Sequence, residues 1–257
     1  MKRNQKYKVL DLFSGIGGFS LGLERAGGFE TIAFCENDEP CQRVLRKHWP
    51  DTPIFPDVTE LNSEELYSQG IKPDLICGGF PCTDISTCGR GVGIHGEKSS
   101  LWHNMFLLIR DVRPEWAIIE NVPALRHRGL TLVLQNLSSL SYVCEVHCIP
   151  AYSLGAPHVR DRLFILAHSA SGGQSGPREF EPSSDSKTVL KRETIDAFNG
   201  RFKEIWATEP QLGRVVDGIP DRMDRLTQLG NSMLPQIPEM IGTAIMEFDD
   251  AEKSLQI

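Results

Sequence analysis

The chain has 257 residues, of which 40% are hydrophobic, 24% charged and 8% aromatic, and its formal net charge is −7. This composition excludes a disordered, collagen-like or disulfide-scaffold protein and leaves a globular chain that is long enough to bury a core. The negative charge gives no overall sign of nucleic-acid binding, so such a function needs local evidence.

No run of apolar residues reaches the length of about 18 that a membrane helix requires, and the N-terminus lacks the pattern of a signal peptide. The seven cysteines are odd in number and lack paired Cys-x-x-Cys spacing, which argues against a disulfide framework and against a zinc site. We therefore expect a cytoplasmic protein that holds no metal and does not contact a membrane.

Short apolar runs alternate with helical patterns along residues 8–167. Strands are predicted over residues 8–13, 30–35, 75–77, 116–119, 142–149 and 162–167. Helices are predicted over residues 19–26, 39–48, 101–112 and 130–137. Such alternation is typical of an α/β fold with an open, doubly wound sheet of parallel strands, which binds ligands at the carboxyl ends of the strands.

The composition changes after residue 168. Residues 169–177 and 181–186 are rich in Ser, Gly and Pro and have the character of a linker. A further helix is predicted over residues 233–247, with Pro235 and Pro238 in or before its first turn. We expect the acidic residues 248–257 to fray from the end of this helix.

A glycine-rich turn follows the first predicted strand. Gly15, Gly17 and Gly18 allow a ligand to approach the backbone and the free N–H groups of the next helix, although an ordinary tight turn would show the same pattern. Glu36 ends the second strand about 20 residues further on, where an acidic residue binds the ribose hydroxyls of an adenosine cofactor. Asp57 either reads the amine of an adenine ring or belongs to a turn or helix cap.

Cys82 differs from the other six cysteines in its position. It follows Gly78, Gly79, Phe80 and Pro81, and the proline fixes the backbone directly before the thiol. Polar residues follow it, so we expect it in a cleft, where a thiolate acts as a nucleophile. The other cysteines are better explained as small apolar residues of the core.

Charged residues lie at the ends of two other predicted strands. Glu120 comes directly after residues 116–119, where poor solvation is expected to raise its pKa until it can donate a proton near neutral pH. It can instead cap a helix or form a salt bridge. Arg160 and Arg162 alternate, so in a strand both face one side and donate to a substrate oxygen or a phosphate, or pair with surface acids.

The order of these motifs resembles that of the C5-cytosine-specific DNA methyltransferases. The motifs that carry the resemblance are residues 11–19, 79–82, 120–122, Arg160-x-Arg162 and residues 230–232. The resemblance covers about residues 7–167 and 212–247, and it implies a Rossmann-like S-adenosylmethionine-dependent methyltransferase sheet with a small target-recognition domain. The implied divisions are a catalytic and cofactor-binding domain (1–168), an unusually short target-recognition region (169–212) and a C-terminal segment that returns to the catalytic domain (213–257).

The resemblance also implies a role for each matching residue. The S-adenosylmethionine site would comprise Phe13, Ser14, Gly15, Gly17, Gly18, Glu36, Asn37, Asp57, Val58, Gly79, Pro81, Leu101, Asn231 and Ser232. The catalytic residues would be Cys82, Glu120, Arg160 and Arg162. The contacts to DNA would be Thr83, Ser86, Arg90 and Lys98, in a loop over residues 83–100 that closes over the target base.

In the implied reaction, the thiolate of Cys82 adds to C6 of cytosine and activates C5 for methyl transfer. Glu120 binds N3 and the 4-amino group, Arg162 donates to O2, and Arg160 supports the loop or a phosphate. The base has to be flipped out of the duplex. The implied partners are double-stranded DNA and a cognate restriction endonuclease or another accessory protein, as in a bacterial or phage restriction-modification pair associated with the nucleoid.

Three other functions stay open. A tRNA cytosine-C5 methyltransferase on the same scaffold would suit an acidic surface, and the nucleic acid that takes up labelled methyl groups distinguishes it. A non-catalytic cofactor-binding homologue would have lost its catalytic residues, whereas Cys82 and Glu120 are both present. An NAD-dependent dehydrogenase would explain the glycine turn and Glu36 but would leave the Pro81–Cys82 turn and residues 120–122 without a role.

Overall fold

The computed structural model describes residues 5–81, 101–154, 156, 160–169, 188–198 and 233–254. Its seven-stranded sheet has the strand order β3-β2-β1-β4-β5-β7-β6. The strands are β1 (Tyr7–Leu12), β2 (Phe29–Cys35), β3 (Ile54–Phe55), β4 (Leu75–Gly79), β5 (Trp116–Asn121), β6 (Tyr142–Pro150) and β7 (Asp161–Ser169). The helices are α1 (Gly18–Ala26), α2 (Glu39–His48), α3 (Ser63–Ser68), α4 (Leu101–Val112), α5 (Leu125–Arg128), α6 (Leu130–Ser139), the 3-10 helix η2 (Ala151–Leu154) and α9 (Gln236–Ser254), and residues 192–198 are also helical.

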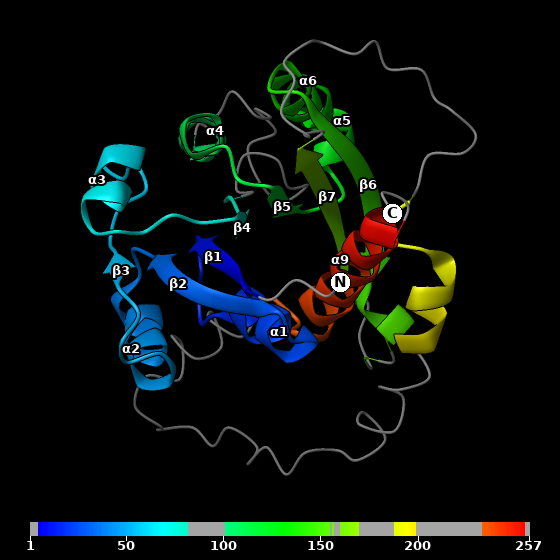
Figure 1. Cartoon of the computed structure of the whole chain (residues 1–257), viewed down its shortest axis with the longest axis horizontal. Coiled ribbons are helices and arrows are strands. Elements are labelled where there is room, and N and C mark those ends of the chain that lie inside the picture. Colours follow the sequence, from blue (N-terminus) through cyan, green and yellow to red (C-terminus); the bar gives the residue numbers. More distant parts are fainter. Residues whose placement is uncertain are drawn as a thin grey trace.

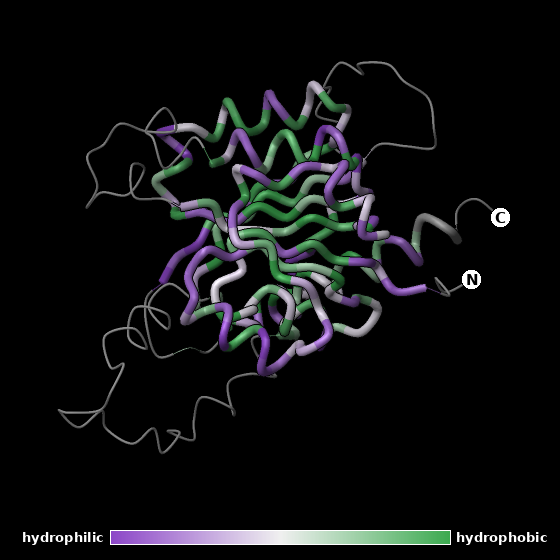
Figure 2. Tube along the Cα trace, turned by 90° about the vertical axis from the view of Figure 1, so that its left-hand side faces the viewer, coloured by the Kyte–Doolittle hydropathy of each residue, from purple (hydrophilic) through white to green (hydrophobic). Residues whose placement is uncertain are grey.

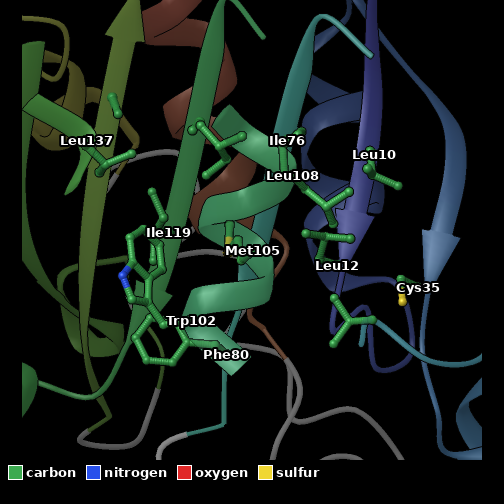
Figure 3. Packing of buried hydrophobic residues seen from close by; sticks show 14 of the residues in the cluster. Leu10, Leu12, Cys35, Ile76, Phe80, Trp102, Met105, Leu108, Ile119 and Leu137 are labelled. Atoms are coloured by element: carbon green, nitrogen blue, oxygen red, sulfur yellow. The ribbon is translucent and has the colours of Figure 1, made fainter. Parts of the chain in front are cut away.

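Helices cover both faces of the sheet, and the apolar strands lie between them (Figures 1 and 2). On one face α3, α4, α5 and α6 contribute to a single apolar cluster, in which the rings of Trp102 and Phe80 lie 5.7 Å apart (Figure 3). On the other face α1, α9 and residues 188–198 pack against the strands. This burial on both sides explains why the strands are nearly continuous apolar runs. None of the described helices is long and apolar enough to cross a membrane.

The five strands β1 to β5 run parallel, so they end at one edge of the sheet, which we call the carboxyl edge. The expectation of a wholly parallel sheet is wrong for β7, which runs antiparallel to β5 and β6. The connection from β6 to β7 spans only residues 151–160, which is shorter than the crossover of about a dozen residues or more that a parallel pair requires. As a consequence β7 begins at the carboxyl edge, where Leu163 pairs with Asn121.

The C-terminal helix α9 lies against α1 (Figure 1) and extends beyond its predicted end. A Cβ atom on Gly22 would lie 2.2 Å from the carbonyl oxygen of Pro235, so only glycine permits this close approach. Further along α9, the buried carboxylate of Asp249 accepts a hydrogen bond from the Tyr7 hydroxyl. The prediction that the chain frays from residue 248 is therefore wrong as far as Ser254, because a side chain of β1 fixes the helix.

Candidate active site

The turn between β1 and α1 has a backbone shaped by its glycines. Phe13, Gly15 and Gly17 have positive φ angles of 53°, 54° and 83°, a region that favours glycine. A Cβ atom on Gly17 would lie 2.7 Å from the Trp49 ring, and one on Gly18 would lie 2.6 Å from the Met233 carbonyl oxygen. Gly15 instead has no atom within 4 Å of a Cβ position, so the described structure leaves open space over its backbone.

Glu36 lies beside this turn, as the spacing in the sequence predicts. Its carboxylate accepts hydrogen bonds from the backbone N–H of Gly15 at 2.7 Å and from that of Asp38 at 2.8 Å. The Gln42 side chain donates to the Glu36 carbonyl oxygen at 2.6 Å. The end of β2 is thus joined to the glycine turn, and an acceptor group lies next to the open space over Gly15.

Four other predicted cofactor residues lie in the same part of the chain. The Ser14 hydroxyl donates to the Asp11 carbonyl oxygen at 2.6 Å and holds the turn closed, whereas Asn37 is exposed at the end of β2. Asp57 is exposed and accepts from the N–H and hydroxyl of Thr59 at 2.8 and 2.7 Å, which lowers the pKa of its carboxyl group. These are the bonds of the turn aspartate that the sequence left as an alternative. Its neighbour Val58 is buried.

Asp11 was not given a role by the sequence motifs. Its side chain is fully buried at the end of β1 and accepts a hydrogen bond from the Ser20 hydroxyl at 2.7 Å. Burial raises the pKa of this carboxyl group to about 7, and the charge of Glu36 adds to the shift. A single acidic residue within an otherwise apolar strand was the available signal. Asp11 fixes the first turn of α1, and with it the glycine turn, to β1.

The ends of β4 and β5 meet at the carboxyl edge. Gly79 pairs with Glu120, and a Cβ atom on Gly79 would lie 2.4 Å from Glu120 Oε2. The Asn121 side chain donates to the Phe80 carbonyl oxygen at 3.1 Å and so fixes the turn that leads to Pro81. Gly79 therefore makes room for a carboxylate directly before the predicted nucleophile, which itself lies outside the described residues.

Glu120 forms an ion pair with Arg162 across the β5–β7 strand pair. The distance from Arg162 Nε to Glu120 Oε1 is 2.7 Å, and the side chains are only 22% and 15% exposed. Burial raises the pKa of the Glu120 carboxyl group, while the charges of Arg162 and Arg160 oppose this rise. The direction agrees with the expectation from the sequence. The antiparallel course of β7 is what brings these arginines to Glu120.

These groups surround a cavity. Its lining residues are Glu120, Arg160, Arg162, Met233, Leu234 and Ile237. Because Met233 also touches the glycine turn at Gly18, the cavity and the turn share a wall. The resemblance placed Asn231 and Ser232, directly before this wall, at the cofactor site, but it gave no role to residues 233–237.

The remaining predicted residues divide into two groups. Leu101 begins α4 and packs against the apolar cluster on that face, and Pro81 is half-buried at the carboxyl edge. The others lie outside the described ranges: Cys82, Thr83, Ser86, Arg90, Lys98, Asn231 and Ser232.

Comparisons with known proteins agree with the motifs. The family model for C-5 cytosine-specific DNA methylase matches residues 7–212. The Type II methyltransferase M2.BsuMI of Bacillus subtilis is 39% identical over 168 residues, which cover 62% of this chain and 41% of that protein. The Type II methyltransferase M.AquIA of a Picosynechococcus strain is 28% identical over 230 residues, which cover 83% of this chain and 90% of that protein.

A solved structure shares this fold. The crystal structure of a candidate DNA modification methyltransferase encoded within an E. coli prophage superposes with a TM-score of 0.54 and 27% identity. The superposition covers 64% of this chain and 47% of that one. Two of the curated relatives are matched over only 41% and 56% of their length, so this chain spans about half of them.

Proposed function

Because the chain belongs to the C-5 cytosine-specific DNA methylase family, we propose that it transfers a methyl group from S-adenosylmethionine to C5 of a cytosine in DNA. The observation that carries this proposal is the partly buried Glu120–Arg162 pair, with 2.7 Å between Nε and Oε1, in a cavity at the carboxyl edge. The cavity shares Met233 with the glycine turn. A base in the cavity and a cofactor over the turn would therefore be neighbours.

The groups around the glycine turn fit S-adenosylmethionine. The space over Gly15 admits a ligand to the backbone, and the carboxylate of Glu36 can exchange its bonds to Gly15 and Asp38 for bonds to ribose hydroxyls. When bound, the cofactor supplies an electrophilic sulfonium methyl group. Further contacts are proposed for Phe13, Ser14, Gly17, Gly18, Asn37, Asp57, Val58, Gly79, Pro81, Leu101, Asn231 and Ser232 on the family pattern.

Cytosine C5 is too weak a nucleophile to react unaided, so the chain has to activate it. We propose that the Cys82 thiolate adds to C6. The Glu120 carboxyl group, whose pKa is raised by burial, holds a proton at N3 and accepts from the 4-amino group. Arg162 orients Glu120 and donates to O2, while Arg160 contributes positive charge to the same cavity. Once C5 has taken the methyl group and the cofactor has become S-adenosylhomocysteine, loss of the C5 proton to solvent and elimination of the Cys82 thiolate from C6 would complete the reaction.

The cavity lies within the protein at the carboxyl edge of the sheet. A cytosine within a duplex therefore has to leave the base stack to reach Glu120. Thr83, Ser86, Arg90 and Lys98 are proposed to contact the DNA around it. Several relatives are named Type II methyltransferases. On this basis a restriction endonuclease that reads the same sequence is the accessory protein that we propose as a partner.

The experiment is methyl transfer from labelled S-adenosylmethionine to plasmid DNA and to tRNA, followed by bisulfite sequencing of the DNA. We expect label in DNA at cytosines of one sequence context, and none with Cys82→Ala. The control is Cys148→Ala, which removes an exposed cysteine of β6 and should keep full activity. Label in tRNA alone would replace DNA with tRNA as the substrate, and turnover by Cys82→Ala above a few per cent of wild type would exclude the covalent route.

A further inference from the structure

A short helix at the carboxyl edge is the only source of charge in a long stretch of sequence. Between Glu120 and Glu145 the chain contains no Asp, Glu or Lys, but it contains Arg126, His127 and Arg128. All three lie on α5. In a chain with a net charge of −7, this grouping is a local reversal of the overall electrostatics.

Backbone hydrogen bonds hold α5 close to the end of β5. The Asn121 side chain accepts from the Val122 N–H at 2.9 Å, and the N–H groups of Leu125 and Arg126 donate to the carbonyl oxygens of residues 122 and 123 at 3.0 and 3.1 Å. The Leu125 side chain is fully buried beneath the helix. The basic residues are therefore mounted on a fixed turn that directly follows Glu120, and α5 leads into α6 on the same face of the sheet (Figure 1).

Two side chains of α5 are available to a ligand. Those of Arg126 and His127 are exposed, and neither side chain forms a hydrogen bond or ion pair within the described part of the chain. Burial and the negative charge of Asp161 raise the pKa of the Cys148 thiol in β6, and the positive charge of Arg126 opposes this rise, so Arg126 lies near the end of β6. A guanidinium group such as that of Arg126 is well suited to phosphate oxygens, to which arginine donates in pairs.

We propose that Arg126 and His127, which we name the α5 basic surface, bind the DNA backbone at phosphates next to the flipped cytosine. The proposal rests on the proposed function, because it takes DNA as the substrate of the cavity at Glu120. Neither of the two residues lines that cavity. The α5 basic surface therefore contributes to DNA affinity and not to cofactor binding or to the chemical step.

The test is the salt dependence of DNA binding by the full chain, measured with a fluorescent duplex in the presence of S-adenosylhomocysteine. The double variant Arg126→Gln/His127→Gln should weaken binding about fivefold to tenfold at moderate salt. It should also reduce the slope of log K against log salt by about one for each phosphate that the variant no longer binds. Affinity for the cofactor and turnover at saturating DNA should stay at wild-type values. Arg126→Lys, which keeps the charge, should retain most of the slope.

Arg25→Gln is the matched control, because it makes the same charge change at an exposed site in the last turn of α1, away from the carboxyl edge. A wild-type slope in the double variant would overturn the proposal, and so would an equal loss of affinity in Arg25→Gln, which would show an effect of net charge alone. If the wild type binds and methylates DNA and the double variant behaves in the same way, the proposal for α5 fails but the proposed function stands. Wild-type protein that neither binds nor methylates DNA would overturn both.

Discussion

Two carboxyl groups near the ends of β1 and β5, which β4 separates, are buried to different degrees. Glu120 is paired with Arg162 and faces a cavity, whereas Asp11 is fully buried against the Ser20 hydroxyl. Burial raises the pKa of both groups, and only at Glu120 do nearby guanidinium charges oppose the rise. In the proposed reaction the raised pKa of Glu120 allows it to hold a proton at N3 of the base, whereas the raised pKa of Asp11 affects the stability of the fold.

The pH dependence of stability follows from Asp11. In the unfolded chain this group ionises near 3.8, but in the folded chain it keeps its proton until about pH 7. Its contribution to the free energy of unfolding is therefore fully present below pH 3.8 and is lost as the pH rises through 7. Asp11→Asn keeps an acceptor for Ser20 but cannot titrate. As the pH rises from 5 to 8, the free energy of unfolding of the variant should therefore increase by about 2 to 3 kcal/mol relative to that of the wild type.

Urea unfolding of both proteins at pH 5 and at pH 8 measures this difference. An equal difference at the two pH values would show that Asp11 does not titrate in this range.

Glu36 carries a prediction about the cofactor. Glu36→Ala should weaken S-adenosylmethionine binding by about 1.5 to 3 kcal/mol, the usual loss for a hydrogen bond to a charged group. The change also frees the N–H of Gly15, which Glu36 holds at 2.7 Å. Calorimetry gives the affinity, and Glu39→Ala, which removes an exposed carboxylate three residues away, is the control. Unchanged affinity in Glu36→Ala would remove this residue from the site.

Among the elements, those with a strong local pattern were predicted best. The helix over residues 39–48 is confirmed at both ends and the helix over residues 101–112 at its C-terminal end, because each has a continuous amphipathic pattern and α2 has its Asp38 cap. The elements β3, α3 and α5 are too short to show a period and were missed. The direction of β7 and the length of α9 depend on contacts with distant strands, which no local pattern contains.

The segment 188–198 packs against one face of the sheet and is not a detached insertion. Val189, Leu190 and Phe198 are buried in the same cluster as Phe164 of β7. The Val189 N–H donates to Glu145 Oε1 at 2.7 Å, and the other oxygen of this carboxylate lies 3.0 Å from His147 Nε2. These bonds lower the pKa of the Glu145 carboxyl group. This part of the predicted recognition region is thereby fixed to β6.

Glu145→Ala should therefore loosen this segment. The loss of a charged acceptor for a partly buried N–H predicts a fall in stability of about 1 to 3 kcal/mol. Trypsin should then cleave faster after Lys191 and Arg192, which mass spectrometry of the first fragments would show. Glu145→Gln keeps an acceptor and should behave more like wild type. Equal cleavage rates in all three proteins would contradict an anchoring role for Glu145.

At the scale of the whole molecule, the sequence predicted those residues of the candidate site that lie at or just after the ends of parallel strands. Gly15, Glu36 and Glu120 were identified in this way, because the carboxyl ends of parallel strands share one edge. The return of the C-terminal segment was expected from the resemblance, but the residues of the cavity wall at Met233 were not, since they depend on how α9 packs on α1. The short recognition region over residues 169–212 stays a prediction.

The recognition region can be tested by exchange. Replacing residues 199–212 with the corresponding segment of a related enzyme, while keeping the buried residues 188–198, should move methylation to a different sequence context. Cofactor affinity should not change, because Gly15 and Glu36 lie outside the exchanged segment. Bisulfite sequencing reads the context. If the chimaera methylates the original sequence, specificity resides elsewhere, for example in residues 83–100 or in a partner.

The bond between Tyr7 and Asp249 has a consequence for the order of events during synthesis on the ribosome. The first strand and its helix α1 are translated well before the surface that α1 packs against and before the Met233 wall of the cavity. A nascent chain therefore carries its glycine turn without the helix that holds it in place. Methylation activity should begin only after residue 249 has left the exit tunnel, and an mRNA truncated before codon 233 should yield inactive protein however much of the sheet it encodes.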